Sequence, residues 1–314
     1  MDAFEPWVHL SGEASAYLDG MRDQCLSLAA AWGTTARGLG EAAPPHSPIR
    51  QDERYVQQRH ADAPLGIGQA PGRAASQYVD AMAQHLQAIA ALLQARQVTL
   101  SMWPIVRAEL EIAGRVGWLL EPGTADHRVT GSQRVARCLM DGIAACCRRR
   151  YTAKRMNDRE EERRAKQARE RLRADLTRLF PDTQTPWTAP GDEAAWNAGE
   201  ESFLSLAKGA DVFGRTWLDD ARGVYDILSD YSHPSLMSLE SQTERIEADG
   251  RIELLYIVHP ETYEWQAKLA CFTLYRAAHL VAGYFSLDIE ILEAWADQAD
   301  RTRSWFHREP RPDG

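Results

Sequence analysis

Four polar residues recur at helical spacing near the middle of the chain: Arg222, Tyr225, Ser229 and His233. At about 100° per residue, they fall within roughly an 80° arc of one helix face. Pro234 cannot continue the helical hydrogen-bond ladder, so His233 is predicted to end the helix. A histidine, a phenol and a hydroxyl beside a fixed cation can transfer protons, which makes His233, Tyr225 and Ser229 candidate catalytic residues. A histidine that only caps the helix is the structural alternative.

A second polar stripe follows a predicted helix over residues 103–120. Arg107, Glu111 and Arg115 lie four positions apart, and the other faces of this helix are apolar except at Glu109. Such a stripe either faces water as a ladder of ion pairs or points at a polar partner inside the fold. The sequence predicts that Arg107 and Glu111 pair with each other or with the stripe that ends at His233. Arg107, Glu111, Arg115 and Arg222 are therefore candidate binding residues.

A further candidate binding residue, Arg276, lies in an apolar run within a predicted helix over residues 260–285. His279 in the same run is expected to be a hydrogen-bonded core residue. The chain holds no His-x-x-x-His or Glu-x-x-His pair, and its five cysteines lack C-x-x-C spacing. We therefore expect no metal site and no cofactor.

The composition is that of an ordinary globular protein, and its net charge argues against a general nucleic-acid binder. The net charge is −9, with 44% hydrophobic and 26% charged residues. No run is long and apolar enough for a membrane span, and no signal peptide is evident, so we expect a cytoplasmic protein without membrane contact. Residues 148–178 reverse the charge, with 13 basic and 6 acidic residues. They could contact RNA phosphates, or form a solvated helix laced with salt bridges because glutamates interleave.

The apolar periodicity predicts a mainly α fold, a multi-helix bundle with one inserted β-hairpin. Residues 1–73 are expected to form an N-terminal helix, about 11–33, and a long surface connection, about 38–72. Residues 74–314 are expected to form the bundle. Its long basic helix, about 131–179, is either unbroken or a broken pair.

Several smaller elements complete the expected bundle. Helices are predicted over about 74–97, 200–208 and 287–305. The hairpin is expected at about 243–258, where apolar and polar residues alternate around Asp249-Gly250.

Two motifs together resemble those of uncharacterised bacterial helical proteins related to the HEPN superfamily. They are the Arg-x-x-x-Glu helix that contains Arg107 and Glu111, and the Tyr-x-x-Leu-Ser-x-x-x-His-Pro-Ser run from Tyr225 to Ser235, followed by a hairpin. The similarity spans about residues 74–285. It implies a helical bundle, often dimeric, and many HEPN proteins are metal-independent RNases. Their signature places an arginine only a few residues before a histidine, whereas His233 follows Arg222 by eleven positions.

Two functions from different classes follow from these patterns. The first is a HEPN-like helical binding or regulatory protein, with a polar cleft for an anionic or polar ligand. The alternative is a metal-independent endoribonuclease of the HEPN type in a toxin or antiviral system. In that case His233 acts as acid and base, and Arg107 or Arg222 stabilises the phosphorane. The resemblance implies a possible homodimer, and RNA contact would use the basic segment 148–178. The wide arginine spacing favours the binding protein.

Overall fold

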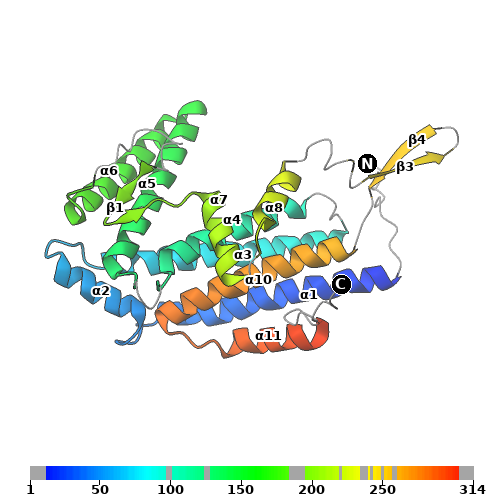
Figure 1. The fold of residues 1–314 in the computed structure, drawn as a ribbon, viewed down its shortest axis with the longest axis horizontal. Coiled ribbons are helices and arrows are strands. Elements are labelled where there is room, and N and C mark those ends of the chain that lie inside the picture. Colours follow the sequence, from blue (N-terminus) through cyan, green and yellow to red (C-terminus); the bar gives the residue numbers. More distant parts are fainter. Residues whose placement is uncertain are drawn as a thin grey trace.

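Long helices packed side by side form the body of the protein in a computed structural model (Figure 1). The structure describes residues 12–96, 101–123, 128–183, 195–218, 221–233, 240, 243–248, 251–256 and 260–303. Its α-helices are α1 (Gly12–Thr35), α2 (Pro48–Arg59), α3 (Ala70–Ala95), α4 (Met102–Leu120), α5 (Gly131–Arg155), α6 (Arg159–Leu179), α7 (Leu206–Trp217), α8 (Val224–Ser232), α10 (Pro260–Phe285) and α11 (Glu290–Arg303). The mainly α bundle with an inserted hairpin is confirmed.

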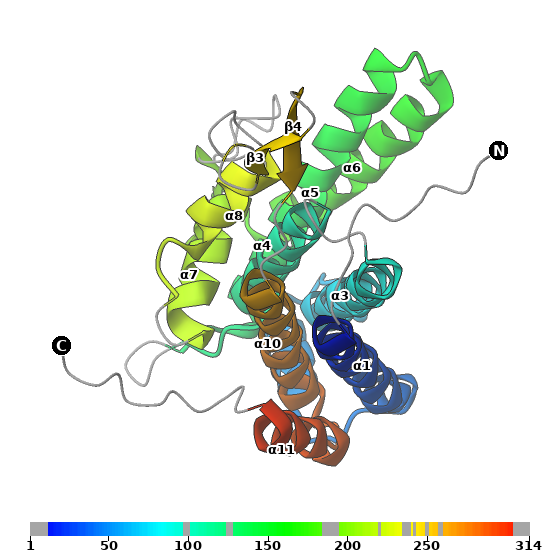
Figure 2. The ribbon, with the colours of Figure 1, turned by 90° about the vertical axis from the view of Figure 1, so that its right-hand side faces the viewer.

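Helix α4 lies at the centre of the bundle. It packs against α3, α5, α7, α8 and α10, whereas α1 packs against α3, α10 and α11. Figure 2 shows α1, α3 and α10 nearly end-on beside α4. Burial of each large apolar side chain contributes about 1.5–3 kcal/mol, so α4 carries much of the core. Its fully buried apolar residues include Met102, Val106, Leu110, Ala113, Val116 and Leu119.

The predicted basic helix is two helices rather than one. Thr130 and Gln133 form a capping box that starts α5, and Asn157 turns the chain with φ 57°. Asp158 then starts α6 by accepting a hydrogen bond from the Glu161 amide at 2.9 Å. The two helices pack along each other and project from the body (Figure 1). The unbroken helix over 131–179 is therefore wrong, and the broken pair is correct.

The expected surface connection over residues 38–72 contains helix α2 and two short 3₁₀ turns, Ala36–Gly40 and Ile67–Gln69. Pro48 occupies the first turn of α2, where its missing amide hydrogen costs nothing. The buried face of α2 consists of Ile49, Asp52 and Val56. Because one of these three is a carboxylate, the apolar periodicity was too weak to predict a helix. The N-terminal region is part of the bundle, since α1 packs against α3 and α10.

The predicted helix over 200–208 is displaced along the chain. Residues Asn197–Ala198 (β1) and Glu201–Ser202 (β2) pair as a short antiparallel ladder, and α7 begins only at Leu206. Gly199 and Glu200 both have positive φ, 55° and 70°, which closes a tight turn between the strands. The helix starts after this turn, where Ser205 caps it by accepting from the Lys208 amide.

The second ladder is the predicted hairpin, formed by β3 (Thr243–Ala248) and β4 (Arg251–Tyr256). Ala248 pairs with Arg251, so the register leaves two residues for the turn. Those residues, Asp249 and Gly250, lie outside the described part of the chain, as does Trp305 beyond the end of α11. None of the described helices has the length and apolar character needed to cross a membrane.

The crossing of α4 and α7 generates a stability prediction. A Cβ atom on Gly114 would lie 2.5 Å from the carbonyl carbon of Gly209. Gly114→Ala must push the two backbones apart, so we expect a loss of about 1–3 kcal/mol in the free energy of unfolding. Urea denaturation measures this change in the free energy of unfolding.

Gly33→Ala in α1 is the matched control, because a Cβ atom on Gly33 would meet no other heavy atom within 4 Å. That substitution should stabilise the helix by up to about 1 kcal/mol. Equal effects of the two substitutions would contradict the close backbone crossing.

Candidate functional site

The candidate site lies where α8 packs across α4. Helix α8 begins at Val224, after Gly223 with φ 73°, and His233 follows its last residue. Leu228 is the buried apolar residue of α8, and Tyr231 stacks on Trp103 of α4 with ring centroids 4.3 Å apart. These contacts set the face of α8 that carries Tyr225 against α4. The prediction that His233 ends its helix is confirmed.

Four side chains meet between the two helices. Arg107 donates from Nε to Glu111 Oε1 at 2.9 Å and from Nη2 to the Tyr225 hydroxyl at 3.0 Å. Tyr225 in turn donates to Glu111 Oε1 at 2.9 Å. Arg107 Nη1 lies 2.6 Å from His233 Nε2. Arg107 and Glu111 were predicted to pair with each other or with the α8 stripe, and both kinds of contact are present. We call these four residues the Arg107 cluster.

The arginine fixes the protonation of the groups around it. A guanidinium can only donate, so His233 Nε2 accepts and the ring proton lies on Nδ1. Burial raises the pKa of Tyr225, and its hydrogen bond to the Glu111 carboxylate adds to that rise. Burial lowers the pKa of Arg107, but the contacts with Tyr225 and Glu111 outweigh it and raise the pKa overall. The cluster therefore holds a permanent cation, the Glu111 carboxylate, a neutral phenol and an imidazole that accepts through Nε2.

Hydrogen-bond donors remain available at the exposed edge of the cluster. Three of the five N–H groups of Arg107 have the partners given above, and the side chain is 21% exposed. His233 is exposed, so its Nδ1–H can meet a ligand from solvent. A molecule that approaches this edge meets donors, which suits an acceptor such as a carboxylate or a phosphate.

Arg115 continues the predicted stripe but is not part of the cluster. It is buried, lies 3.3 Å from Asp141 and donates to the Leu204 carbonyl. Its guanidinium also packs over the rings of Trp118 and Phe203. Asp141 further accepts from the Tyr78 hydroxyl at 2.5 Å. Arg115 thus links α4 to α5 inside the protein through its ion pair with Asp141.

Three other predicted site residues are not among the four that define the cluster. Arg222 precedes α8 in a turn, so its expected place on the helical stripe is wrong. Gly223 interrupts the helix there, which shifts the start to Val224. Ser229 is half-buried on α8 and Arg276 is exposed on α10 beside the ring of Tyr275. Within the described residues, no hydrogen bond or ion pair joins Ser229 or Arg276 to Arg107.

A buried acid on α4 escaped the sequence-based search for site residues. Glu109 is fully buried, and His85 Nδ1 lies 3.5 Å from its Oε1, a long contact. Burial raises the pKa of Glu109 to about 7, although His85 opposes the rise. The signal in the sequence was the lone carboxylate on an apolar face. Because solvent does not reach its side chain, we assign Glu109 to stability.

Within the described residues, no group of three or more His, Cys, Asp or Glu side chains could hold a metal ion. Comparison of the chain with known protein families, with curated proteins and with solved structures finds no match. The site must therefore be interpreted from its own geometry.

The Arg107 cluster predicts the effect of Glu111→Ala. Glu111 accepts from both Arg107 and Tyr225 but keeps 18% of its side-chain surface exposed. Loss of a charged hydrogen-bond partner at such a site should cost about 1.5–3 kcal/mol, as measured by thermal or urea unfolding.

Glu160→Ala on α6 is the matched control, because Glu160 pairs with Arg164 at the same spacing but in solvent. Exposed pairs contribute about 0–1 kcal/mol. If both variants melt like the unmodified protein, the cluster contributes nothing to folding.

Glu109 predicts a pH dependence of stability. Its folded-state pKa of about 7 exceeds the ordinary value of 4.5, so between these values the folded protein holds a proton that the unfolded chain has released. The free energy of unfolding should therefore fall by roughly 1 kcal/mol per unit as pH rises from 4.5 to 7. The contact with Glu109 raises the pKa of His85, and the stability that this contributes is also lost as pH rises. Urea unfolding at several pH values measures the slope.

Glu109→Gln keeps the size of the side chain and removes the titrating group. In this variant, the free energy of unfolding should depend much less on pH. Above pH 7, it should exceed that of the unmodified protein. An unchanged slope in Glu109→Gln would assign the pH dependence to other groups.

Proposed function

We propose that the protein is a helical binding or regulatory protein whose Arg107 cluster takes an anionic or polar ligand. The observation that carries this is the 2.6 Å contact between Arg107 Nη1 and His233 Nε2, which gathers a permanent cation and an exposed imidazole at one edge. An incoming carboxylate or phosphate would bind the remaining N–H groups of Arg107 and the Nδ1–H of His233.

Glu111 and Tyr225 support the proposal as positioning groups. The Glu111 carboxylate holds the Arg107 Nε, and Tyr225 bridges the two by accepting from the arginine and donating to the carboxylate. A guanidinium that is already oriented loses little conformational entropy when it binds a ligand. The ring of Tyr225 also lies 5.3 Å from the guanidinium carbon, which adds a cation–π contact.

The alternative is a metal-independent endoribonuclease of the HEPN type, for which the same arginine–histidine contact is the favourable observation. His233 would move the proton of a ribose hydroxyl, and Arg107 would stabilise the charge that develops on phosphorus. Against it, His233 Nε2 is occupied by Arg107 and is not free to act as a base. In this alternative, the resemblance further implies a homodimer, and the composition of the sequence predicts a cytoplasmic location.

Part of the positive charge of α5 and α6 is neutralised between and within the two helices. Arg149 pairs with Glu161, Arg150 with Glu162 and Arg164 with Glu160, although basic residues outnumber acidic ones by 13 to 6 over residues 148–178. Paired cations release fewer counterions when they meet phosphate, so RNA contact through residues 148–178 is the weaker proposal.

Titration with inorganic phosphate tests the binding proposal. NMR signals of the His233 ring should shift on addition of phosphate, and His233→Ala should weaken binding by about tenfold because one charged hydrogen bond is lost. Arg276→Gln is the control, since it removes an exposed arginine that lies apart from the cluster, and its affinity should be unchanged. Equal affinity in His233→Ala and the unmodified protein would overturn the proposal.

Incubation with total RNA in the presence of EDTA separates the two functions. We expect no cleavage by the unmodified protein. Cleavage that His233→Ala reduces by about 10²–10⁴, with an unchanged melting temperature, would establish the endoribonuclease instead.

A further inference from the structure

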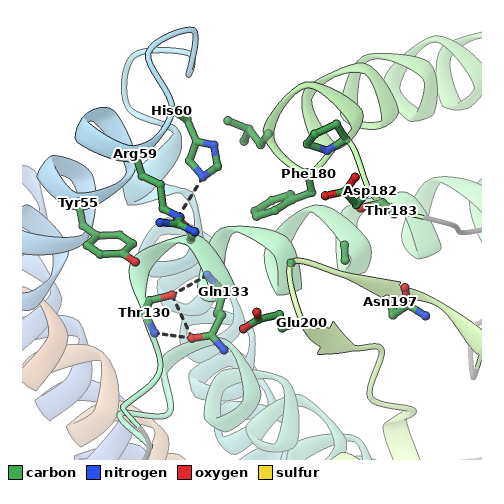
Figure 3. Close-up of a pocket in the computed structure, with 15 residues that line it drawn as sticks. Tyr55, Arg59, His60, Thr130, Gln133, Phe180, Asp182, Thr183, Asn197 and Glu200 are labelled. Carbon is green, nitrogen blue, oxygen red and sulfur yellow. Dashed lines mark hydrogen bonds between the residues drawn. The ribbon is translucent and has the colours of Figure 1, made fainter.

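A polar pocket lies beside α5, where four parts of the chain meet (Figure 3). The end of α2, the start of α5, the end of α6 and the turn between β1 and β2 enclose a volume of about 440 Å³. This volume is within the range of small-molecule sites. The pocket shares no residue with the Arg107 cluster, so it is an independent candidate site.

The wall of the pocket is held in place by packing and by hydrogen bonds. His60 Nε2 lies 3.2 Å from the hydroxyl of Ser132, which is 6% exposed. The ring of His60 meets the edge of Phe180 with centroids 5.6 Å apart. A Cβ atom on Gly199 would lie 2.7 Å from the Phe180 ring, so only glycine lets the turn approach the ring this closely. The cavity is therefore preformed.

Charges of both signs line the pocket without being paired. Among its described lining residues, Arg59 is the one lysine or arginine, and Asp182 and Glu200 are the carboxylates. None of the three forms an ion pair or side-chain hydrogen bond within the described part of the chain. Figure 3 shows Arg59 and His60 on one side, with Asp182 across the pocket beyond Phe180 and Glu200 below.

The contrast with the neighbouring charges makes this arrangement informative. Arg134 next to the pocket donates to Asp52 at 2.9 Å, and Arg137 donates to Glu201 at 2.7 Å. Charges nearby are thus neutralised in pairs, whereas the three charges that face the cavity are held apart. A ligand with one sign of charge would be attracted to one side and repelled by the other.

We propose that this pocket binds a small zwitterion, whose acidic group meets Arg59 and Ser132 and whose amine meets Asp182 and Glu200. Both ends of such a molecule find an opposite charge, and the polar groups between them can meet hydroxyls and amides on the wall. Burial lowers the pKa of His60, and the charge of Arg59 lowers it further. The imidazole is therefore neutral at neutral pH, so the charges of the pocket are those of Arg59, Asp182 and Glu200.

A length series of ω-amino carboxylates tests the proposal on the full chain. Glycine, β-alanine, 4-aminobutyrate and 6-aminohexanoate would be compared by saturation-transfer NMR with hexanoate and hexylamine, which each carry only one of the two charges. At least one amino acid of the series should bind more tightly than both single-charge compounds. The length that binds best reports the separation of the two charged sides.

Variants at the exposed charges complete the test without disturbing the core. Arg59→Gln and the double variant Asp182→Asn/Glu200→Gln should each weaken binding of the best compound by about tenfold. Arg54→Gln is the matched control, because it removes an exposed arginine of the same helix that does not line the pocket, and its affinity should be unchanged. The proposal is overturned if no amino acid of the series binds, if hexanoate or hexylamine binds equally well, or if the pocket variants bind like the control.

Discussion

The enclosure of α4 by its neighbours is the constraint on which the rest of the structure depends. A charge inside a bundle loses its hydration and must be compensated by a partner or by a change of protonation. Each charged residue of α4 meets this requirement differently. Arg115 finds Asp141 across the interface with α5, and Glu109 has its pKa raised to about 7. Arg107 and Glu111 satisfy each other and draw in Tyr225 from α8.

The sequence was informative where one face of a helix differs sharply from the rest. On α4, charged residues on an apolar background predicted both the helix and the pairing of Arg107 with Glu111. On α2, a carboxylate occupies the buried face, so the apolar periodicity did not predict a helix. Asp52 is buried there because it accepts from Arg134 and from the hydroxyl of Tyr284, partners that are distant in the sequence. A periodicity rule treats such a residue as exposed, because its partners are set by tertiary structure.

The two candidate sites also differ in how far the sequence alone predicts them. The Arg107 cluster comes from two helices, each with a regular polar stripe, so its main residues could be predicted, although Gly223 excluded Arg222 from the helix. The zwitterion pocket has no such stripe. His60 and Ser132 are 72 positions apart, and a turn with positive φ completes the wall. Only the packing of α2 against α5 brings them together, and no local pattern encodes that packing.

Helix α8 is attached to α4 by a small apolar contact and by the hydrogen bonds of the Arg107 cluster. Leu228 is the buried residue of α8, supported by the stacking of Tyr231 on Trp103. The remaining ties to α4 that the structure describes include the hydrogen bonds of Tyr225 and His233. Any ligand that rearranges Arg107 therefore also changes how firmly α8 is docked. Amide hydrogen exchange in α8 would register occupancy of the cluster, because segments with few buried apolar contacts are those that open locally in proteins.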